Sequence, residues 1–587
     1  MSSKHFSNDP LALVSASLRA ATYTNPSLTF DATHKIVSLR DAASQSTIAL
    51  ISGGGSGHEP SFAGFVGKGF LTAAVAGSVF ASPSAEQIFR AIRRVASEQP
   101  QRGVLVIIMN YTGDMLHFGM AVEKARAEGI NAQLLVVGDD VGVGRKRGGR
   151  IGRRGLAGTV LVQKIAGAAA AQGLTLEQVY DITNLAAQHT VTVGASLAHV
   201  HVPGREITTD ELADEIEIGM GIHNEEGFGR VKATLPSLVE TMLKQLLDQS
   251  DKDRAYVDIK QGEDVVVMVN NLGGISPLEL GAITTEVMDQ LAATYKINPK
   301  RLLSGTYMTS LNGLGFSVTL LKVVDEAFLS LIDAPADAAG WSPPVQPENW
   351  ERGVETGKLE EEETDNAQDA ESAFSSNLQV DAQITNKKLR AALNSLIAAE
   401  PEVTKYDTIV GDGDCGLCLK TGAEAVLKFL DALPQETSQI DAVKLVRDIA
   451  LVVERSMDGT SGALYAIFIN ALASGLQSQS TSSSSKTTAT PQTWANALRS
   501  ALTSLAKYTP AQPGDRTVVD ALAPFVTTLA ETLHLGHAID AAKKGCDSTK
   551  GMEASLGRSV YVNAQGWNEC PDPGAYGLVK LLEGFLG

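Results

Sequence analysis

Two kinds of hydrophobic spacing divide the chain into two parts. Up to residue 342, short runs of β-branched and aliphatic residues lie next to Gly or Asn, and Ala-rich or amphipathic segments separate them. The runs predict buried strands, and the segments between them predict helices that cover a sheet. The expected strands are Ile48–Ile51, Val104–Ile108, Leu134–Val137 and Val265–Val269, and the expected helices include Ala85–Ala96 and Met120–Glu128. We therefore expect an α/β domain in this part.

Two shorter patterns add detail to the first part. Residues Gly305–Val323 alternate around Asn312-Gly313, and Asn-Gly is the preferred centre of a two-residue turn between antiparallel strands. We expect a β-hairpin there. Thr208–Glu211 matches a capping box, which predicts the start of a short helix.

Helical spacing dominates the second part of the chain. Apolar residues recur there every three or four positions, as one face of an α-helix requires. Three such faces are Leu389, Leu393, Leu396 and Ile397; Val446, Ile449 and Val453; and Val519, Leu522, Val526 and Leu529. We predict no strand in this part and expect an all-α helical bundle.

Composition and charge add a boundary between the two parts. The 587 residues are 44% apolar and 20% charged, which is ordinary for several globular domains. A Pro-rich stretch at 343–347 precedes residues 351–371, where nine acidic and two basic residues lie among few large apolar ones. Such a charge run is typical of a solvated linker. We expect an α/β domain over 1–342, an acidic linker over 343–380 and an all-α domain over 381–587.

The charge and cysteine counts exclude several classes of protein. With 49 Lys and Arg against 67 Asp and Glu, the formal net charge is −18, whereas a nucleic-acid binder needs clustered positive charge. Four cysteines are too few for a disulfide scaffold and fit a reducing compartment. The longest apolar run, Phe70–Ala81, is too short to span a bilayer, and the N-terminus has no signal-peptide core. We expect a soluble cytoplasmic protein with no nucleic-acid or membrane partner.

Two motifs of the first part place polar groups at strand ends. Ser52–Pro60 contains three consecutive glycines, which let backbone N–H groups converge on a small oxygen-rich ligand, and His58, an available acid or base. The motif lacks the Gly-Lys-Ser/Thr of a P-loop. Met109–Asp114 ends in a carboxylate that could deprotonate a substrate hydroxyl. The alternative is that each motif is only a structural turn.

Two further segments of the first part carry histidine or arginine. In Glu217–Gly227, three glycines around His223 leave room for a ligand beside the imidazole, although a purely structural histidine is the alternative. Arg145–Arg154 carries six cations in ten residues but lacks the interleaved aromatic residues of nucleic-acid sites. It is either a mobile loop facing an anionic ligand or another domain, or a solvated loop.

The second part contains a candidate metal site. Asp407, Asp412 and Asp414 lie within eight residues, on a Gly-rich loop at the end of a predicted helix. Placing like charges together is costly unless a cation neutralises them, and hard oxygen ligands suit Mg²⁺. A polar turn without metal is the alternative. The neighbouring Cys415 and Cys418 have no second pair that would complete a zinc site.

Four further loops have the chemistry for contacts with phosphate or a nucleotide base. Asp458–Gly462 offers hydroxyl and N–H groups at a helix start, where phosphate binds well. Gly514–Thr517 and Gly557–Arg558 offer guanidinium groups. Asp572–Ala575 is a tight turn that could line a base. Each of these signals is weak alone.

Taken together, the motifs resemble one family, the single-chain ATP-dependent dihydroxyacetone kinases of the fungal and bacterial type. The family's signatures occur in order as GGGSGHEP, NYTGD, GMGIH, VGDGDCG, GTSGALY, GDRT and DPGA. The resemblance covers both parts of the chain. It implies a substrate-binding K domain of two α/β subdomains, followed by an all-α L domain, a helical bundle or barrel that binds ATP and Mg²⁺. It also implies a homodimer.

The resemblance implies roles for individual residues. His223 would attack the carbonyl group of dihydroxyacetone or glyceraldehyde and form a covalent hemiaminal, with His58 and Asp114 as acid and base partners. The substrate contacts would be Gly55, Ser56, Gly57, His58, Ser82, Met109 and Asp114. The metal ligands would be Asp407, Asp412 and Asp414. The ATP contacts would be Asp414, Cys415, Gly416, Leu417, Thr460, Ser461, Arg516, Arg558, Asp572, Pro573 and Gly574.

Three positions depart from the pattern of the family that the motifs resemble. Met109 stands where a substrate-contacting Lys is expected, Asp458 replaces a Gly beside the phosphates, and Glu226 stands where Pro is usual. Two alternatives to kinase activity stay open. One is FAD-AMP lyase chemistry at the same metal site, which gives cyclic FMN. The other is a non-catalytic regulator that binds dihydroxyacetone.

Overall fold

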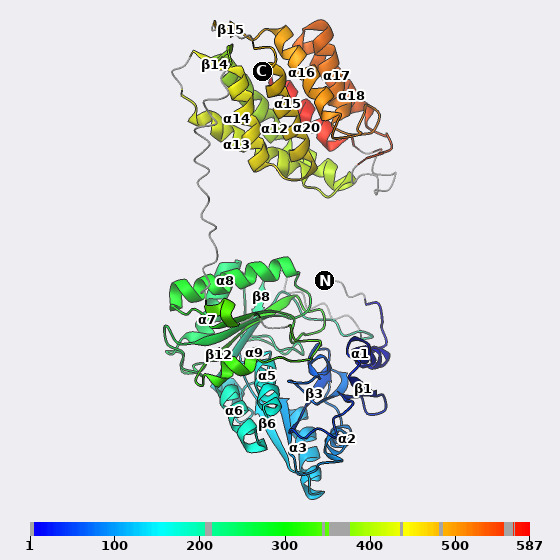
Figure 1. The fold of residues 1–587 in the computed structure, drawn as a ribbon, viewed down its shortest axis with the longest axis vertical. Helices are drawn as coiled ribbons and strands as arrows, with labels where there is room; N and C mark the ends of the chain where they lie inside the picture. Colours follow the sequence, from blue (N-terminus) through cyan, green and yellow to red (C-terminus); the bar gives the residue numbers. More distant parts are fainter. Residues whose placement is uncertain are drawn as a thin grey trace. The chain divides into compact units, whose positions relative to one another are not determined.

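The computed structural model describes residues 5–205, 214–342, 345, 347–351, 376–434, 438–480, 485–556, 568 and 570–586 (Figure 1). The chain forms two compact units, Met1–Gly357 and Lys358–Gly587. The helix start predicted at Thr208–Glu211 and the ATP contact predicted at Arg558 lie outside the described residues, as does most of the predicted linker. The boundaries predicted at 342 and 381 stay predictions.

The first of two six-stranded sheets in the first unit has the order β1-β2-β4-β3-β5-β6 (Figure 1). Its strands are β1 (Leu28–Asp31), β2 (Ile36–Leu39), β3 (Ala49–Ser56), β4 (Ala73–Val79), β5 (Val104–Met109) and β6 (Ala132–Val137). Strands β4, β3, β5 and β6 are parallel, and β1 and β2 pair antiparallel at one edge. Every residue of β5 is buried and apolar, because helices cover both faces of the sheet.

Helices flank this sheet in two pairs. The helices of this part of the chain are α1 (Pro10–Thr24), η1 (Ala63–Phe65), α2 (Ala85–Ala96), α3 (Thr112–Ala127), α4 (Arg145–Gly148), α5 (Gly158–Ala171) and α6 (Leu176–Gln188). Helices α2 and α3 pack on one another, as do α5 and α6, on opposite faces of the sheet (Figure 1). Helix α2 begins at a capping box of Ser84 and Gln87 and buries Ile88 and Ile92.

The second sheet has the order β11-β10-β12-β7-β8-β9. Its strands are β7 (Thr190–Ser196), β8 (Ile216–Ile218), β9 (Gly229–Val231), β10 (Val265–Asn271), β11 (Arg301–Gly305) and β12 (Gly315–Lys322). Strands β10 and β11 pair in parallel, and the other pairs are antiparallel. Helices α7 (Leu235–Leu247) and α8 (Pro277–Tyr295) pack together on this sheet, and α9 (Ala327–Asp333) and α10 (Pro347–Glu351) follow it.

Helix α5 joins the two sheets. It contacts β3 and β5 of the first sheet and β7 and β12 of the second, and it is buried from Gly158 to Ala170. A β-carbon at Gly167 would lie 2.4 Å from the Phe70 Cα atom, so only glycine allows this packing. One hydrophobic core therefore extends over both sheets, and residues that follow strands of either sheet are able to meet.

The predicted fold class is confirmed, but the hairpin predicted around Asn312-Gly313 is wrong. Strand β12 pairs with β10 and β7, while β11 pairs with the other edge of β10. The residues between β11 and β12 instead bond to more distant segments. Asn270 Oδ1 accepts the N–H groups of Tyr307 at 2.8 Å and Met308 at 2.9 Å. The Leu311 N–H group donates to the Gly57 carbonyl at 2.7 Å. This loop supports the Gly-rich motif rather than a local turn.

The second unit is a closed ring of helices. They are α12 (Ala382–Val410), α13 (Cys415–Ala432), α14 (Ala442–Ser456), α15 (Gly459–Gln477), α16 (Pro491–Leu505), α17 (Val519–Thr532), α18 (Leu535–Ser548) and α20 (Pro573–Gly584). Each helix packs on the next, and α20 returns to pack on α12. This arrangement is the all-α barrel expected from the helical spacing and the resemblance.

The prediction that this part contains no strand is wrong. A small sheet has the order β14-β13-β15, with β13 (Leu378–Asp381), β14 (Gln439–Asp441) and β15 (Thr487–Thr488). These strands have two to four residues, which is too short for a period-two signal in the sequence. Asp381 and Asp441 each end a strand and cap the helix that follows.

Helix α15 is the one described helix that is long and apolar enough, by length and composition, to cross a membrane. It packs against α14 and α16 of the ring, and Ala466, Ala473 and Leu476 of this helix are buried in the unit. Length and composition alone are weak evidence for a membrane span, because a core helix meets the same criteria.

Candidate active site

Two histidines from different sheets meet in the first unit. His58 follows β3 of the first sheet and is fully buried. His223 lies in the loop between β8 and β9 of the second sheet, with 19% of its side chain exposed. Their Nε2 atoms are 3.0 Å apart, and the rings meet edge-on with centroids 4.7 Å apart. The fold thus brings together two residues from separate motifs.

The hydrogen bond made by Nδ1 identifies the tautomer of each histidine ring. His58 Nδ1 lies 2.9 Å from the Thr309 carbonyl oxygen, which can only accept, so this nitrogen carries a proton. His223 Nδ1 lies 2.8 Å from Glu225 Oε1. Burial alone would raise the pKa of Glu225, but the hydrogen bonds from His223 lower it to about 2. Glu225 is thus an ionised acceptor, and His223 Nδ1 also carries a proton.

One further proton lies between the two rings. Both Nδ1 atoms donate outward, so the contact between the Nε2 atoms needs a proton on one of them. Burial, and after it the charge of His223, lowers the pKa of His58 to about 3. Burial thus disfavours the proton on His58, and the Glu225 carboxylate lies where it balances a proton on the His223 ring. Such a pair is able to exchange one proton with a ligand bound beside it.

Aromatic rings wall the histidine pair. Phe80 stacks on His58 with centroids 5.3 Å apart and lies edge-on to His223 at 5.2 Å. Tyr111 meets His223 edge-on at 4.7 Å, and burial raises the pKa of Tyr111 well above its usual value. Phe80 has a positive φ of 60°, a conformation that non-glycine residues rarely adopt. These rings shield the imidazoles from water and leave part of His223 accessible.

Asp114 provides a carboxylate beside the same Gly-rich motif. It occupies the first turn of α3 and is 3% exposed. Burial raises its pKa to about 6, against the opposing effects of a Ser82 hydrogen bond and the His223 charge. A β-carbon at Gly54 would lie 3.5 Å from Asp114 Oδ2. Within the described part of the chain, Asp114 Oδ1 has no hydrogen-bond partner. This oxygen is a ready acceptor for a ligand hydroxyl group.

The other predicted substrate contacts lie around these groups. A β-carbon at Gly55 would lie 2.7 Å from the Ala81 nitrogen, so the chain passes closely there. Gly57 has a φ of +104°, and Ser56 Oγ donates to the Gly77 carbonyl at 3.0 Å. Met109 ends β5 and is 1% exposed, and a β-carbon at Gly155 would lie 2.6 Å from its Cβ atom. The Met109 side chain therefore belongs to the core.

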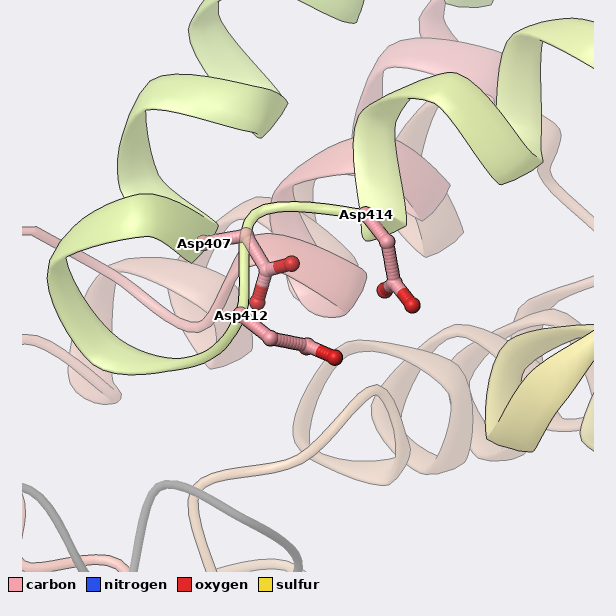
Figure 2. Close-up of side chains that lie close together, drawn as sticks. All are labelled: Asp407, Asp412 and Asp414. Atoms are coloured by element: carbon pink, nitrogen blue, oxygen red, sulfur yellow. The ribbon is translucent and has the colours of Figure 1, made fainter. Parts of the chain in front are cut away.

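The second unit holds the three predicted metal ligands together (Figure 2). Asp407, Asp412 and Asp414 each offer a carboxylate oxygen, and these oxygens lie within 4.8 Å of one another. Asp407, in the last turn of α12, is buried and accepts the Cys415 N–H group at 3.0 Å. Asp412 and Asp414 are exposed. Three convergent hard oxygen ligands fit Mg²⁺.

Two predicted nucleotide loops border this triad. Cys415 Sγ lies 3.7 Å from Ser461 Oγ, so the start of α15, with Thr460 exposed, lies beside the start of α13. Asp572 caps α20 by accepting the Ala575 N–H group at 2.7 Å. Burial raises the pKa of Asp572 to about 7, and the nearby Asp407 charge adds to that rise. The predicted contacts at Pro573 and Gly574 belong to the same turn, and those at Gly416 and Leu417 to the first turn of α13.

Comparisons with known proteins decide the family. A family model described as Dak1 domain matches residues 19–340, and one described as DAK2 domain matches residues 409–587. The dihydroxyacetone kinase of Pichia angusta is 43% identical over 611 residues, covering 100% of this chain and 98% of its own. The chain belongs to the dihydroxyacetone kinase family. The resemblance carried by the seven motifs is thereby confirmed.

Two further comparisons connect the family to known structures and activities. A crystal structure of the dihydroxyacetone kinase from C. freundii in complex with AMP-PNP and Mg²⁺ is 31% identical, covers 99% of both chains and has a TM-score of 0.61. The triokinase/FMN cyclase of Homo sapiens is 37% identical over 596 residues, covering 100% of this chain and 99% of its own. Both similarities extend over the α/β unit and the helical ring.

Arg516 has surroundings that sequence reasoning did not anticipate in this member of the dihydroxyacetone kinase family. It is 1% exposed and donates from Nη1 to the Thr549 carbonyl and from Nη2 to the Cys570 carbonyl, the latter at 3.0 Å. These bonds hold two backbone segments beneath the Asp572 turn. A phosphate contact of Arg516 stays a prediction.

Sequence reasoning missed four groups that complete the site: Glu225, Thr309, Phe80 and Tyr111. Glu225 had a local signal, since a His-x-Glu spacing places a carboxylate beside the histidine ring. Thr309 had none, because its carbonyl oxygen reaches His58 across 251 positions of sequence. Family motifs name side chains, whereas this contact comes from the backbone of a loop.

Proposed function

We propose that this member of the family transfers the γ-phosphoryl group of ATP to a hydroxyl group of dihydroxyacetone, with glyceraldehyde as a second substrate. The observation that carries the proposal is the 3.0 Å contact between the Nε2 atoms of His58 and His223, near an Asp114 oxygen that has no hydrogen-bond partner among the described residues. The names of the family's characterised relatives support the same activity.

His223 is the proposed attachment point for the substrate. Its Nε2 atom would add to the carbonyl carbon and form a hemiaminal, a bond that only a ketone or an aldehyde allows. Glycerol has the hydroxyl groups but no carbonyl group, so this chemistry rejects it. The aromatic walls and the partly accessible His223 ring support such a role.

Asp114 is the proposed base for the hydroxyl group that attacks phosphorus. With a pKa raised to about 6, it is ionised at neutral pH and still more basic than an exposed carboxylate. Gly55, Gly57 and Ser82 are proposed to hold the substrate in place. Met109 is buried, so any contact it makes would be apolar.

The helical unit is proposed to hold ATP and Mg²⁺. The proposed metal ligands are Asp407, Asp412 and Asp414, whose oxygens already converge. When bound, Mg²⁺ neutralises charge on the phosphate groups during phosphoryl transfer. Thr460 and Ser461 at the start of α15 are proposed to meet phosphate oxygens, because helix N-termini favour anions. Asp572, Pro573 and Gly574 are proposed to line the base.

ADP release tests the activity directly. The full-length protein with ATP and Mg²⁺ should release ADP with dihydroxyacetone and not with glycerol. Equal rates with the two substrates, or no release with either, would contradict the proposal. Intact-protein mass spectrometry should show one substrate unit added to the wild-type chain, and no addition to His223→Ala.

FAD-AMP lyase activity is the second candidate, since one relative is named a triokinase/FMN cyclase. It would use the metal site of the helical unit without the histidine pair. Asp412→Ala should therefore abolish both activities, whereas His223→Ala should abolish only the kinase. If the His223→Ala variant forms cyclic FMN, the protein also has FAD-AMP lyase activity. A non-catalytic regulator instead predicts substrate binding without any ADP release.

A cytoplasmic homodimer is the proposed form of the protein. Four free cysteines, Cys415, Cys418, Cys546 and Cys570, fit a reducing compartment. Mixing His223→Ala chains with Asp412→Ala chains tests cooperation between two copies. Recovered ADP release would support catalysis across chains, and no recovery would restrict it to one chain.

A further inference from the structure

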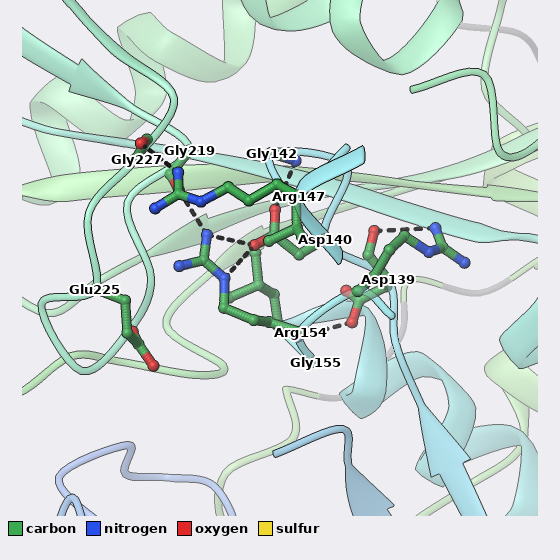
Figure 3. Close-up of polar contacts among 12 residues, drawn as sticks. Asp139, Asp140, Gly142, Arg147, Arg154, Gly155, Gly219, Glu225 and Gly227 are labelled. Atoms are coloured by element: carbon green, nitrogen blue, oxygen red, sulfur yellow. Dashed lines mark hydrogen bonds and ion pairs between the residues drawn. The ribbon is translucent and has the colours of Figure 1, made fainter. Parts of the chain in front are cut away.

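The basic segment Arg145–Arg154 is bonded to its own unit (Figure 3). Arg145 stacks over Tyr256, with its guanidinium carbon 4.1 Å from the ring centroid. Arg147 donates to the Gly227 carbonyl at 2.8 Å. The segment is therefore not a solvated loop, and it reaches the loop that carries His223.

Arg154 of this segment also bonds to the loop that carries His223. Its Nε atom donates to Asp140 Oδ2 at 2.8 Å, and its Nη2 atom donates to the Gly219 carbonyl at 2.6 Å (Figure 3). The Asp140 side chain is fully buried and that of Arg154 is 15% exposed. Tyr111, which packs on His223, donates to the Gly155 carbonyl at 3.1 Å. The guanidinium group is thus fixed in a single orientation.

The lack of a side chain at Gly221 leaves room for the side chains of both Arg154 and Glu225. A β-carbon at Gly221 would lie 2.6 Å from Arg154 Nη1 and 2.0 Å from Glu225 Oε2. After burial and the His223 hydrogen bonds, the charge of Arg154 is a further influence on the pKa of Glu225, and it lowers that pKa. Glu225 in turn accepts from His223 twice, from the ring at 2.8 Å and from the backbone N–H at 2.9 Å.

We propose that Glu225 and Arg154 are positioning residues for the reaction of His223. Glu225 holds the His223 ring by accepting from Nδ1, which directs Nε2 at His58, and its carboxylate balances a positive charge on that ring. Arg154 acts through Glu225, since its Nη1 atom lies near the Glu225 carboxylate at Gly221. Asp140 acts one step further away, by fixing Arg154. This inference rests on the proposed function, in which His223 forms the hemiaminal.

The proton count explains why a carboxylate is needed there. Before attack the histidine pair shares one proton and carries one positive charge. That proton passes to His58, which frees the lone pair of His223 Nε2. The lone pair forms the bond to the carbonyl carbon, the π pair moves to the carbonyl oxygen, and this oxygen takes the proton from His58. The His223 ring is then bonded to carbon at Nε2 and protonated at Nδ1, so it again carries one positive charge beside Glu225.

Carbon-13 NMR of the full-length protein with dihydroxyacetone labelled at C2 tests this inference, because C2 becomes tetrahedral in the adduct. Glu225→Gln keeps an acceptor for Nδ1 but removes the charge. We expect a fall of about 10- to 100-fold in kcat and a matching loss of the tetrahedral signal, as for hydrogen bonds to charged groups. Arg154→Met should lower kcat and the tetrahedral signal by about tenfold. Arg154→Lys should retain most of the wild-type kcat and signal.

Arg150→Met is the matched control, since it removes an exposed cation from the same segment. It should leave the adduct signal and kcat unchanged. Full adduct formation in Glu225→Gln, or equal behaviour of Arg154→Met and Arg150→Met, would overturn the inference. If Glu225→Gln fails to fold, the Arg154→Met and Arg154→Lys pair decides. A wild-type protein that phosphorylates dihydroxyacetone without a tetrahedral signal would instead refute the hemiaminal in the proposed function.

Discussion

His58 and His223 meet through the same ring nitrogen, Nε2, at 3.0 Å, with both Nδ1 atoms already donating to other groups. The pair therefore holds one proton that neither the Thr309 carbonyl nor Glu225 is able to take. His58 is the neutral member, since burial lowers its pKa to about 3. The neutral imidazole of His58 lies within hydrogen-bond distance of His223 Nε2, as a proton transfer between the two rings requires.

Replacing His58 should slow the reaction without unfolding the protein. In His58→Asn the amide oxygen is able to accept a hydrogen bond but not the proton itself, so the Nε2 lone pair stays blocked. We expect kcat to fall by about 10²- to 10⁴-fold, the usual contribution of one general acid or base. Stopped-flow ADP release measures this change. His34→Asn removes a remote histidine and should match the wild type; equal losses in the two variants would contradict the prediction.

The pKa of Asp114 links activity and stability to pH in opposite directions. It is raised to about 6 from 3.8, so the basic form is lost below pH 6 and kcat should fall there. Between pH 3.8 and 6 the folded state holds a proton that the unfolded state has lost. Stability therefore declines as pH rises through this window, by up to about 3 kcal/mol.

Asp114→Asn is the variant that separates these two effects. It should abolish ADP release and yet raise the free energy of unfolding at pH 7, because a buried charge is removed. Urea unfolding at pH 7 and at pH 5 measures the difference, which should be larger at pH 7. A variant that is less stable than the wild type at pH 7 would show that the carboxylate stabilises the fold.

The carboxylate triad should make stability depend on Mg²⁺. Without metal, Asp412→Asn relieves repulsion among like charges and should raise the free energy of unfolding by about 1 kcal/mol. With Mg²⁺ and ATP the wild type should instead be more stable than Asp412→Asn, because ligands that bind only the folded state stabilise it. Thermal unfolding of both proteins with and without Mg²⁺ measures this reversal of their relative stability. Glu424→Gln, an exposed change on α13, should show none.

A side chain at Gly221 should lower activity without preventing folding. A methyl group there would stand between Arg154 and Glu225, whose flexible ends would move aside and release His223. Gly221→Ala should therefore fold but lose about 10- to 100-fold in kcat, as hydrogen bonds to charged groups predict. Gly229→Ala is the matched control, because a β-carbon at that position of the neighbouring strand meets no atom within 4 Å. Equal activity of the two variants would exclude the effect.

Arg516 should contribute to stability more than to nucleotide affinity. Arg516→Met leaves the carbonyl groups of Thr549 and Cys570 without their donor, which should cost about 2–4 kcal/mol of unfolding free energy. Urea unfolding measures this loss, with the exposed Arg499→Met as a control. A variant of normal stability with a raised KM for ATP would point to a phosphate contact instead.

Local sequence signals predicted the elements of the fold well. The run at Val104–Ile108 lies within β5, and Ala85–Ala96 has the bounds of α2, because burial and capping are encoded within a few residues. The hairpin prediction failed because Asn312-Gly313 lies in a loop whose neighbours bond to Asn270 and Gly57. Tertiary contacts of this kind override a local turn preference.

The site was predictable only as separate motifs. His58 and His223 stand 165 positions apart, and nothing in either motif specifies a contact between their Nε2 atoms. The basic segment illustrates the same limit: its charges indicated an anionic ligand or a solvated loop, whereas Arg154 is bonded to Asp140 and Gly219. A charge pattern shows that partners are needed, but topology decides which ones are near.

The origin of the two histidines in different sheets has an evolutionary consequence. His58 follows a strand of the first sheet and His223 lies between strands of the second, so a gene fragment that encodes either sheet alone lacks half of the pair. Neither sheet can then be lost while this chemistry survives. Selection for the reaction therefore keeps both sheets together in the α/β unit.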